Sequence, residues 1–282
     1  MKFSTFYKLY YVHRLKKVNF FLKIYIYIIL PIRYLFNIPF LPKKINLDQY
    51  SKKNSELFKR DLDYLFEHFN SDKGNYYIDQ YIQPIKMSKT RIHAHGYSNI
   101  YEKYFSKIKD KKLNILEIGS FYGNSAASIF YYFKNSKIYS GDIFPDLYRY
   151  TSIRLENFYV DSSEEDSIKN TILNKNVNFD IIIEDASHAL KDQIISLFLL
   201  FKKISSGGLF IIEELDFPDT RQDSNLDNEF PSLKEILNSI KNNKDFNSKY
   251  IDNSDKEYFL KNYKTISIFK GKNNEVAIIE KK

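Results

Sequence analysis

The stretch Leu116-Glu117-Ile118-Gly119-Ser120-Phe121-Tyr122-Gly123-Asn124-Ser125 decides the fold prediction. It joins the end of an apolar run to the start of a helical pattern, and it places glycines at 119 and 123. Glycine lets a backbone turn sharply and come close to a ligand, and the first N–H groups of the following helix face that ligand. The stretch therefore predicts a strand–turn–helix unit that binds a nucleotide-like cofactor.

The glycine spacing of this turn discriminates between two cofactors. A dinucleotide-binding turn, G-x-G-x-x-G, needs glycines at 119, 121 and 124, and the chain lacks the last two. The methyltransferase turn, acidic-x-G-x-G-x-G, keeps Glu117, Gly119 and Gly123 and loses its middle glycine to Phe121. Asp142 ends the next strand, where a carboxylate can accept both ribose hydroxyls. The pattern favours S-adenosylmethionine, and a plain turn with a solvated Asp142 is the alternative.

Apolar runs typical of buried strands alternate with helical patterns along the chain. The strand-like runs cover residues 113–118, 137–142, 179–184 and 208–213, and the helical patterns cover 55–69, 97–108, 124–133, 164–173 and 188–203. Continuous apolar runs are expected where helices cover both faces of a parallel sheet. Two late runs, 265–270 and 275–280, predict a closing antiparallel hairpin. We therefore predict a Rossmann-like α/β fold with a mostly parallel sheet.

Acidic residues and a histidine follow two of the predicted strands. Glu184-Asp185-Ala186-Ser187-His188 ends one strand and Glu213-Glu214 ends the next. Because the carboxyl ends of parallel strands meet at the ligand-binding edge of an open sheet, we expect Asp185, His188 and Glu214 to converge there. Two carboxylates suit Mg²⁺, which would lower the pKa of a substrate hydroxyl, and a neutral histidine could take its proton. The alternative for His188 is a structural role as a helix cap.

The charge is unevenly spread along the chain. Residues 1–60 contain 13 Lys or Arg and two acidic residues, so they carry +11, and the remainder carries −3 of the net +8. Basic clusters flank an apolar and aromatic stretch at residues 18–41; they are Arg14, Lys16, Lys17, Lys43 and Lys44. We predict a helical N-terminal arm at residues 1–54 and a catalytic domain at residues 55–282.

The arm suits two kinds of partner. Its longest unbroken apolar run, at residues 24–30, is far shorter than the roughly 20 residues of a spanning helix, so we expect none. Residues 1–45 suit an anionic membrane surface, or they pack on the domain or on a partner subunit of a homo-oligomer. The chain contains no cysteine, which fits a reducing cytoplasm. The expected location is the cytoplasm, at the inner face of the membrane if the arm binds lipid.

With these motifs, the chain resembles the sugar O-methyltransferases of macrolide biosynthesis, of the mycinamicin and macrocin type. The resemblance covers about residues 70–282. It rests on Ser71-Asp72-Lys73-Gly74, His95-Gly96-Tyr97, Tyr101-Glu102, the turn at 116–125, the segment 180–188 and the segment 207–214. It implies the class I methyltransferase fold with a seven-stranded sheet, S-adenosylmethionine and Mg²⁺ as cofactors, and a hydroxyl of a sugar or glycoconjugate as the acceptor.

The resemblance also implies roles for single residues. Asp185 and Glu214 would ligate Mg²⁺, with Glu102 as a third ligand, and His188 would be the general base. Glu214 stands where the family more often has Asp. The expected cofactor-binding residues are Asp72, Tyr97, Glu117, Gly119, Ser120, Gly123, Asn124, Ser125, Asp142, Asp161 and Asp185. Of these, Asp161 would lie near the adenine.

Two other functions compete with this interpretation. Phe121 and Glu214 depart from the family pattern, so a same-fold relative that does not methylate, either hydroxylase-like or simply cofactor-binding, is the first alternative. A nucleic-acid methyltransferase that uses the basic arm for phosphate contacts is the second. The −3 charge of residues 61–282 argues against nucleic acid as a partner.

Overall fold

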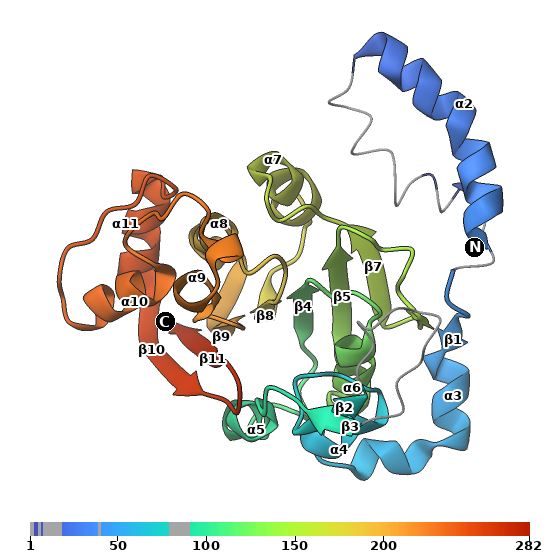
Figure 1. Cartoon of the computed structure of the whole chain (residues 1–282). Coiled ribbons are helices and arrows are strands. Elements are labelled where there is room, and N and C mark those ends of the chain that lie inside the picture. Colours follow the sequence, from blue (N-terminus) through green and yellow to red (C-terminus); the bar gives the residue numbers. More distant parts are fainter. Residues whose placement is uncertain (1–2, 5–6, 8–18, 39–40, 79–90) are drawn as a thin grey trace.

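The computed structural model describes residues 3–4, 7, 19–38, 41–78 and 91–282, so the basic cluster at 14–17 lies outside the described residues. Within them, seven strands form one central sheet in the order β10-β11-β9-β8-β4-β5-β7 (Figure 1). The parallel strands are β4 (Asn114–Ile118), β5 (Lys137–Asp142), β7 (Leu155–Tyr159), β8 (Phe179–Glu184) and β9 (Ile204–Ile212). Strand β11 (Glu275–Lys281) is antiparallel to β9 and to β10 (Tyr263–Lys270). The predicted α/β fold, the mostly parallel sheet and the closing hairpin are confirmed.

Strand β7 is the part of the sheet that the apolar runs did not mark. It lies at the edge of the sheet beside β5, and four of its five residues are only partly buried. An edge strand covered incompletely by helices does not need a continuous apolar sequence, and β7 contains Glu156 and Asn157. The strand is therefore identified by its pairing with β5 and not by its amino-acid composition.

Helices cover both faces of the sheet because alternate strand residues point to opposite sides. One face, with Ile115, Ile181 and Ile183, packs on α3 (Leu47–Lys53), α4 (Leu62–His68), α5 (Ser98–Phe105) and α6 (Asn124–Tyr132). The other face, with Leu116 and Ile182, packs on α7 (Glu165–Ile168), α8 (Leu190–Leu200), α10 (Leu233–Lys241) and α11 (Asn253–Asn262). The two apolar layers hold the carboxyl ends of the parallel strands at one edge.

The helix bounds differ from the predicted ones mainly at the ends. The predicted 55–69 helix is a 3₁₀ turn at Ser55–Lys59 followed by α4, and α7 continues as a π-helical segment at Lys169–Leu173. Helices α9 (Phe217–Thr220), α10 and α11 were not predicted. The start of α10 has a capping box in which Ser232 and Glu235 bond each other's backbone N–H groups. That S-x-x-E pattern is a sequence signal for a helix start.

The N-terminal segment has two structurally different parts. Helix α2 (Phe20–Asn37) extends away from the sheet (Figure 1), and no helix of the described residues is long and apolar enough to cross a bilayer. In contrast, β1 (Ile45–Asn46) pairs with β6 (Tyr150–Thr151), and Leu47 at the start of α3 is completely buried. Residues 45–53 therefore pack on the domain, although they fall inside the segment that the sequence assigned to the arm.

Candidate active site

The predicted cofactor turn joins β4 to α6 and keeps its shape without its middle glycine. Gly119 has φ +91° and Gly123 has φ +78°, and a Cβ on Gly119 would overlap the backbone carbonyl of Asp185. Phe121 adopts φ +41°, the left-handed conformation that a glycine would take without strain. Its N–H donates to the Asp142 Oδ2 atom at 2.7 Å, which holds this conformation. The substitution at 121 therefore leaves the turn able to receive a ligand.

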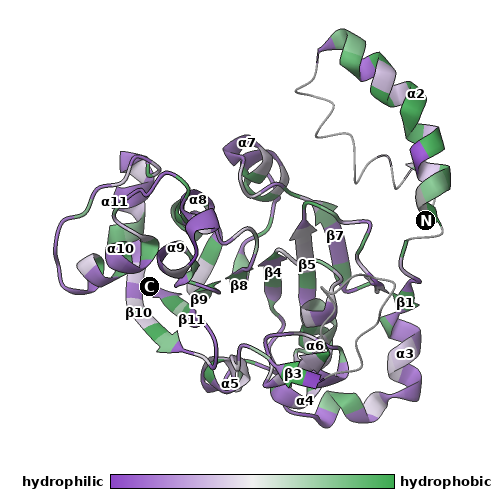
Figure 2. Cartoon of the chain, viewed as in Figure 1, coloured by the Kyte–Doolittle hydropathy of each residue, from purple (hydrophilic) through white to green (hydrophobic). Residues whose placement is uncertain are grey.

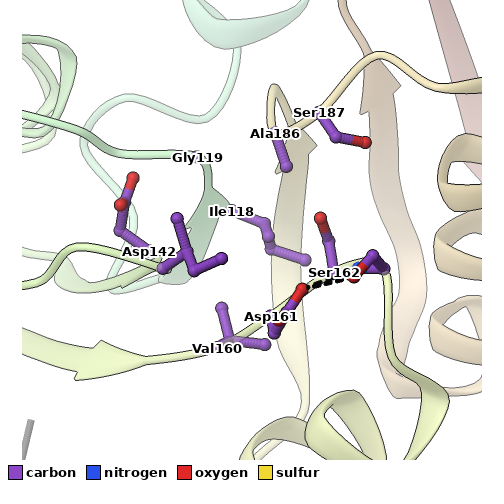
Figure 3. Close-up of a pocket in the computed structure, with 10 residues that line it drawn as sticks. Ile118, Gly119, Asp142, Val160, Asp161, Ser162, Ala186 and Ser187 are labelled. Atoms are coloured by element: carbon purple, nitrogen blue, oxygen red, sulfur yellow. Dashed lines mark hydrogen bonds between the residues drawn. The ribbon is translucent and has the colours of Figure 1, made fainter. Parts of the chain in front are cut away.

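A cavity of about 250 Å³ lies beside the turn (Figure 3). Figure 3 shows Ile118, Val160 and Ala186 around it, and Asp142 and Asp161 on its wall. Both carboxylate oxygens of Asp142 accept backbone N–H groups, and burial raises the pKa of Asp142. The lining is mostly apolar, which suits a flat base with a polar edge. The structure thus places Asp142 and Asp161, which the sequence assigned to the cofactor, on the wall of one cavity.

A smaller polar cavity of about 40 Å³ continues from the turn toward the strand ends. The predicted cofactor residues that line it are Asp72, Glu117, Gly119, Ser120, Asn124, Ser125 and Asp185. Glu117 is completely buried, and neither of its carboxylate oxygens has a hydrogen-bond partner. Burial raises the pKa of Glu117 despite the nearby Lys73 ammonium. A buried carboxylate of this kind suits a ligand that donates hydrogen bonds.

A buried lysine stands at the centre of the acidic residues. The Lys73 ammonium contacts Asp185 Oδ2, Glu213 Oε2 at 2.8 Å and Glu117 Oε1 at 3.6 Å, and the side chain is 1% exposed. Burial lowers the pKa of Lys73, but the three carboxylates outweigh burial and raise it well above its usual value. Tyr101 also donates a hydrogen bond to Glu213. Lys73 is therefore a fixed cation that links the turn at 71–74 to the ends of two strands.

His95, which lies in the loop before α5, pairs with Glu214, the second of the two glutamates that follow β9. The His95 Nε2 atom lies 2.9 Å from Glu214 Oε1, and His95 Nδ1 lies 3.0 Å from Asn274 Oδ1. Burial lowers the pKa of His95, but the bond to Glu214 and the neighbouring carboxylates raise it to about 9. Burial favours protonated Glu214, yet the hydrogen bond from His95 and the nearby imidazole of His188 lower the pKa of Glu214 to about 2. The pair is thus an imidazolium–carboxylate pair at neutral pH.

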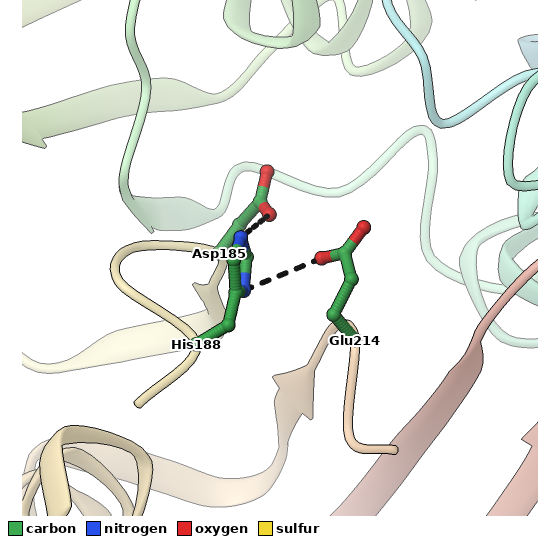
Figure 4. A group of neighbouring side chains, drawn as sticks. All are labelled: Asp185, His188 and Glu214. Atoms are coloured by element: carbon green, nitrogen blue, oxygen red, sulfur yellow. Dashed lines mark ion pairs between the residues drawn. The ribbon is translucent and has the colours of Figure 1, made fainter. Parts of the chain in front are cut away.

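Three side chains converge at this edge as the sequence predicted (Figure 4). In the described residues, Asp185, His188 and Glu214 offer one ligand atom each within 4.8 Å of one another. His188 Nε2 lies 3.8 Å from Asp185 Oδ1, and His188 Nδ1 lies 3.4 Å from Glu214 Oε2. His188 Nδ1 and Glu214 Oε2 are buried without a hydrogen-bond partner. The group therefore has unused donor and acceptor capacity.

His188 is not a helix cap. The residue before α8 is Ala189, and His188 lies in the preceding loop with φ +56°. Glu214 also has a positive φ, +45°. Positive φ in residues with a side chain costs free energy and collects at functional sites. Burial lowers the pKa of His188, so its ring is neutral at pH 7.

A larger cavity of about 520 Å³ opens over this group. His188 and Glu214 lie on its wall together with Phe217, Arg221 and Tyr77. The Phe217 ring meets the His188 ring edge to face at 5.1 Å, and the Arg221 guanidinium lies 4.5 Å from the Phe217 ring centre. The cavity thus combines an aromatic wall with the converging polar side chains.

Two predicted site residues lie elsewhere. Glu102 does not join the acidic group; it lies beside Tyr132 at the end of α6. The neighbouring residue Tyr101 points to Glu213 instead, because successive residues of a helix are turned by about 100°. Tyr97 is completely buried, stacks on the His95 ring at 5.3 Å and does not line the three cavities. It therefore packs against His95 and lies outside the walls of these cavities.

Sequence reasoning assigned no role to Lys73, His95 or Glu213. All three stand in segments that the resemblance singled out, so the signal was their presence in the motifs at 71–74, 95–97 and 207–214. The contact from Lys73 to Glu213 joins residues 140 positions apart. No local pattern predicts such a contact, and the structure alone brings these residues into the site.

No family model matches the chain. Two curated proteins of Streptomyces olivaceus are similar in sequence over 128 residues. They are an 8-demethyl-8-alpha-L-rhamnosyl tetracenomycin-C 2'-O-methyltransferase, 27% identical, and an 8-demethyl-8-(2-methoxy-alpha-L-rhamnosyl)-tetracenomycin-C 3'-O-methyltransferase, 25% identical. Each match covers 43% of this chain and about a third of the relative's length, 33% and 32%.

The fold is similar to that of a solved methyltransferase. The MycE methyltransferase from the mycinamycin biosynthetic pathway, in complex with Mg and SAH, matches 79% of this chain and 55% of its own length. The TM-score is 0.57 at 20% sequence identity, and a second crystal form gives 0.59. The chain therefore has the class I methyltransferase fold, as the sequence predicted.

Proposed function

We propose that this chain, a relative of the sugar O-methyltransferases in sequence and fold, transfers a methyl group from S-adenosylmethionine to a hydroxyl of a sugar or glycoconjugate with the help of Mg²⁺. The observation that carries the proposal is the convergence of Asp185, His188 and Glu214 between the cofactor turn and the larger cavity. A methyl donor on one side and an acceptor on the other would meet at these side chains. Proximity of this kind is a large part of catalysis of group transfer.

The cavities beside the turn fit S-adenosylmethionine. The apolar cavity between Asp142 and Asp161 suits the adenosine, and the polar cavity with Asp72 and Glu117 suits the amino-acid end. The Glu117 carboxylate, which pairs with Lys73 at 3.6 Å but accepts no hydrogen bond, would accept hydrogen bonds from an ammonium group. S-adenosylmethionine supplies an electrophilic methyl group on a sulfonium.

The strand-end side chains fit a divalent cation. Asp185 Oδ1 and Glu214 Oε2 remain after Lys73 and His95 have taken the other oxygen of each carboxylate. Hard cations such as Mg²⁺ prefer oxygen to imidazole, so the two carboxylates are the proposed ligands and His188 is left free. Bound there, Mg²⁺ would lower the pKa of an acceptor hydroxyl and orient it.

The residues of the chain supply the proton transfer. Neutral His188 would accept the hydroxyl proton at Nε2, since its Nδ1 atom is enclosed and faces Glu214 Oε2. The ionised Glu214 would stabilise the imidazolium that forms, and His95 holds that carboxylate in place. A positioned general base of this kind contributes a factor of about 10²–10⁴ to the rate.

The wall of the larger cavity favours a sugar as the acceptor. The Phe217 ring lies beside His188, and an aromatic face packs well against the C–H face of a pyranose. The curated relatives are named for rhamnosyl groups, which agrees with such an acceptor. A same-fold relative that binds the cofactor without methylating is the competing function.

The test is methyl transfer from labelled S-adenosylmethionine to a panel of alkyl rhamnosides and other alkyl glycosides with Mg²⁺. We expect His188→Ala to lower kcat by a factor of about 10²–10⁴ and to leave the affinity for S-adenosylhomocysteine unchanged. The matched control is His93→Ala, since His93 is exposed on β3 (Arg91–His93). Cofactor binding without transfer to any glycoside would instead support the competing function.

A further inference from the structure

Helix α2 presents a face of large apolar side chains that the described residues leave uncovered. Figure 2 shows α2 as largely hydrophobic and extended away from the domain. Phe21, Ile28, Ile32, Leu35 and Phe36 are 82%, 65%, 49%, 65% and 72% exposed. Their spacings of three, four and seven residues place them on one side of the helix. Side chains of this kind are normally buried, so among the described residues this face has no partner.

The opposite side of α2 has partners within the chain. The Phe3 ring meets the Tyr34 ring at 5.3 Å, and the Tyr7 ring stacks on the Tyr27 ring at 5.9 Å. The hydroxyls of Tyr7 and Tyr27 lie 2.7 Å apart, and Leu30 is 2% exposed. The arm thus covers one side of α2 with its own residues and leaves the apolar side outward.

The charge of the arm identifies the partner. The first 47 residues contain nine Lys or Arg and no Asp or Glu, whereas a soluble protein surface usually mixes both signs. Lys23 and Arg33 lie on α2 away from the face with Phe21 and Ile28, by the 100° step of the helix. Two copies of such an arm would repel each other, and an anionic surface would attract it.

We propose that α2 lies along the surface of an anionic membrane, with Phe21, Ile28 and Leu35 among the acyl chains. Lys23 and Arg33 then reach the headgroups, because long basic side chains extend toward the polar layer while their stems stay in apolar surroundings. Tyr25, four residues after Phe21 and three before Ile28, lies on the same apolar face of the helix. This inference concerns the arm and goes beyond the proposed methyl transfer.

The test is flotation of the full chain with vesicles of equal parts phosphatidylglycerol and phosphatidylcholine, and with vesicles of phosphatidylcholine alone. We expect binding to the anionic vesicles that weakens with salt. Ile28→Glu and Leu35→Glu should each reduce it by about tenfold or more, because a carboxylate would replace an apolar contact. The matched control is Ile153→Glu, since Ile153 is 90% exposed on the domain and should not change binding.

Two results would overturn the proposal. One is equal binding of the Ile28→Glu variant and the unchanged chain, or no binding to anionic vesicles by either. The other is a dimer in sedimentation equilibrium that Ile28→Glu dissociates, which would make the apolar face an interface between copies. Neither result bears on methyl transfer to a water-soluble glycoside, so the two proposals fail separately.

Discussion

Lys73 supplies the positive charge that stabilises the acidic side chains at the strand ends. Its ammonium is 1% exposed and contacts carboxylates from β4, from the loop after β8 and from the end of β9. Without a cation at this position, the buried carboxylates of Glu117 and Glu213 and the partly buried one of Asp185 would face one another. Because a buried charge without a partner costs much more than a buried pair, Lys73 stabilises the site by pairing with these carboxylates.

We expect Lys73→Met to lower the free energy of unfolding by about 3–5 kcal/mol, since it leaves buried carboxylates unpaired. Urea denaturation measures this loss. The matched control is Lys169→Met, which removes the surface pair with Glu165 and should cost less than about 0.5 kcal/mol. Equal costs for the two variants would contradict the buried role of Lys73.

At the scale of residues, the sequence predicted which side chains lie together where their position follows from the strand ends. Asp185, His188 and Glu214 follow β8 and β9, and parallel pairing alone brings their backbones to one edge. Glu102 was misplaced because helical phase, which the motif does not reveal, turns it away. Lys73 was missed because its partners lie 112 and 140 residues further along the chain.

At the scale of elements, the turn between β4 and α6 shows which glycines matter. Gly119 lies against the backbone of Asp185, so it is required both by its φ of +91° and by lack of space. Gly207 also has a positive φ, +73°, but nothing lies within 4 Å of the place where a Cβ would be. A side chain at Gly207 would therefore cause backbone strain alone, whereas a side chain at Gly119 would cause both strain and steric overlap.

We expect Gly119→Ala to abolish binding of S-adenosylhomocysteine and to destabilise the chain by more than the roughly 1–2 kcal/mol of a left-handed alanine. The added methyl group must displace the Asp185 carbonyl, which adjoins the proposed cofactor and metal sites. Gly207→Ala should cost about 1 kcal/mol and leave the affinity unchanged. Isothermal calorimetry and thermal unfolding distinguish these outcomes, and unaltered affinity in the Gly119→Ala variant would contradict the assignment of the turn.

At the scale of the whole molecule, residues before 55 also pack on the domain. Leu47 is completely buried, and the Asp48 carboxylate accepts hydrogen bonds from Ser152 Oγ at 2.7 Å and from the Ile153 N–H at 2.9 Å. Together with the β1–β6 pairing, these contacts attach residues 45–53 to the domain. We propose that the catalytic domain begins near residue 45 and that α2 belongs to the arm.

We expect a chain that begins at residue 55 to unfold with a free energy about 3 kcal/mol lower than a chain that begins at residue 41. The loss combines the burial of Leu47 with the hydrogen bonds of Asp48. Denaturant unfolding of the two chains checks this difference. If both chains are equally stable, the boundary that the sequence predicted at residues 54 and 55 is the better one.

The sequence by itself determined the α/β alternation, the cofactor turn and the strand ends that carry Asp185, His188 and Glu214. These features depend on periodicity and on short spacings, which are local properties of a chain. The tertiary structure alone decided that Lys73 and His95 enter the site, that Glu102 does not and that α2 keeps an apolar face outward. Such contacts join distant segments, and their geometry depends on how the helices pack on the sheet.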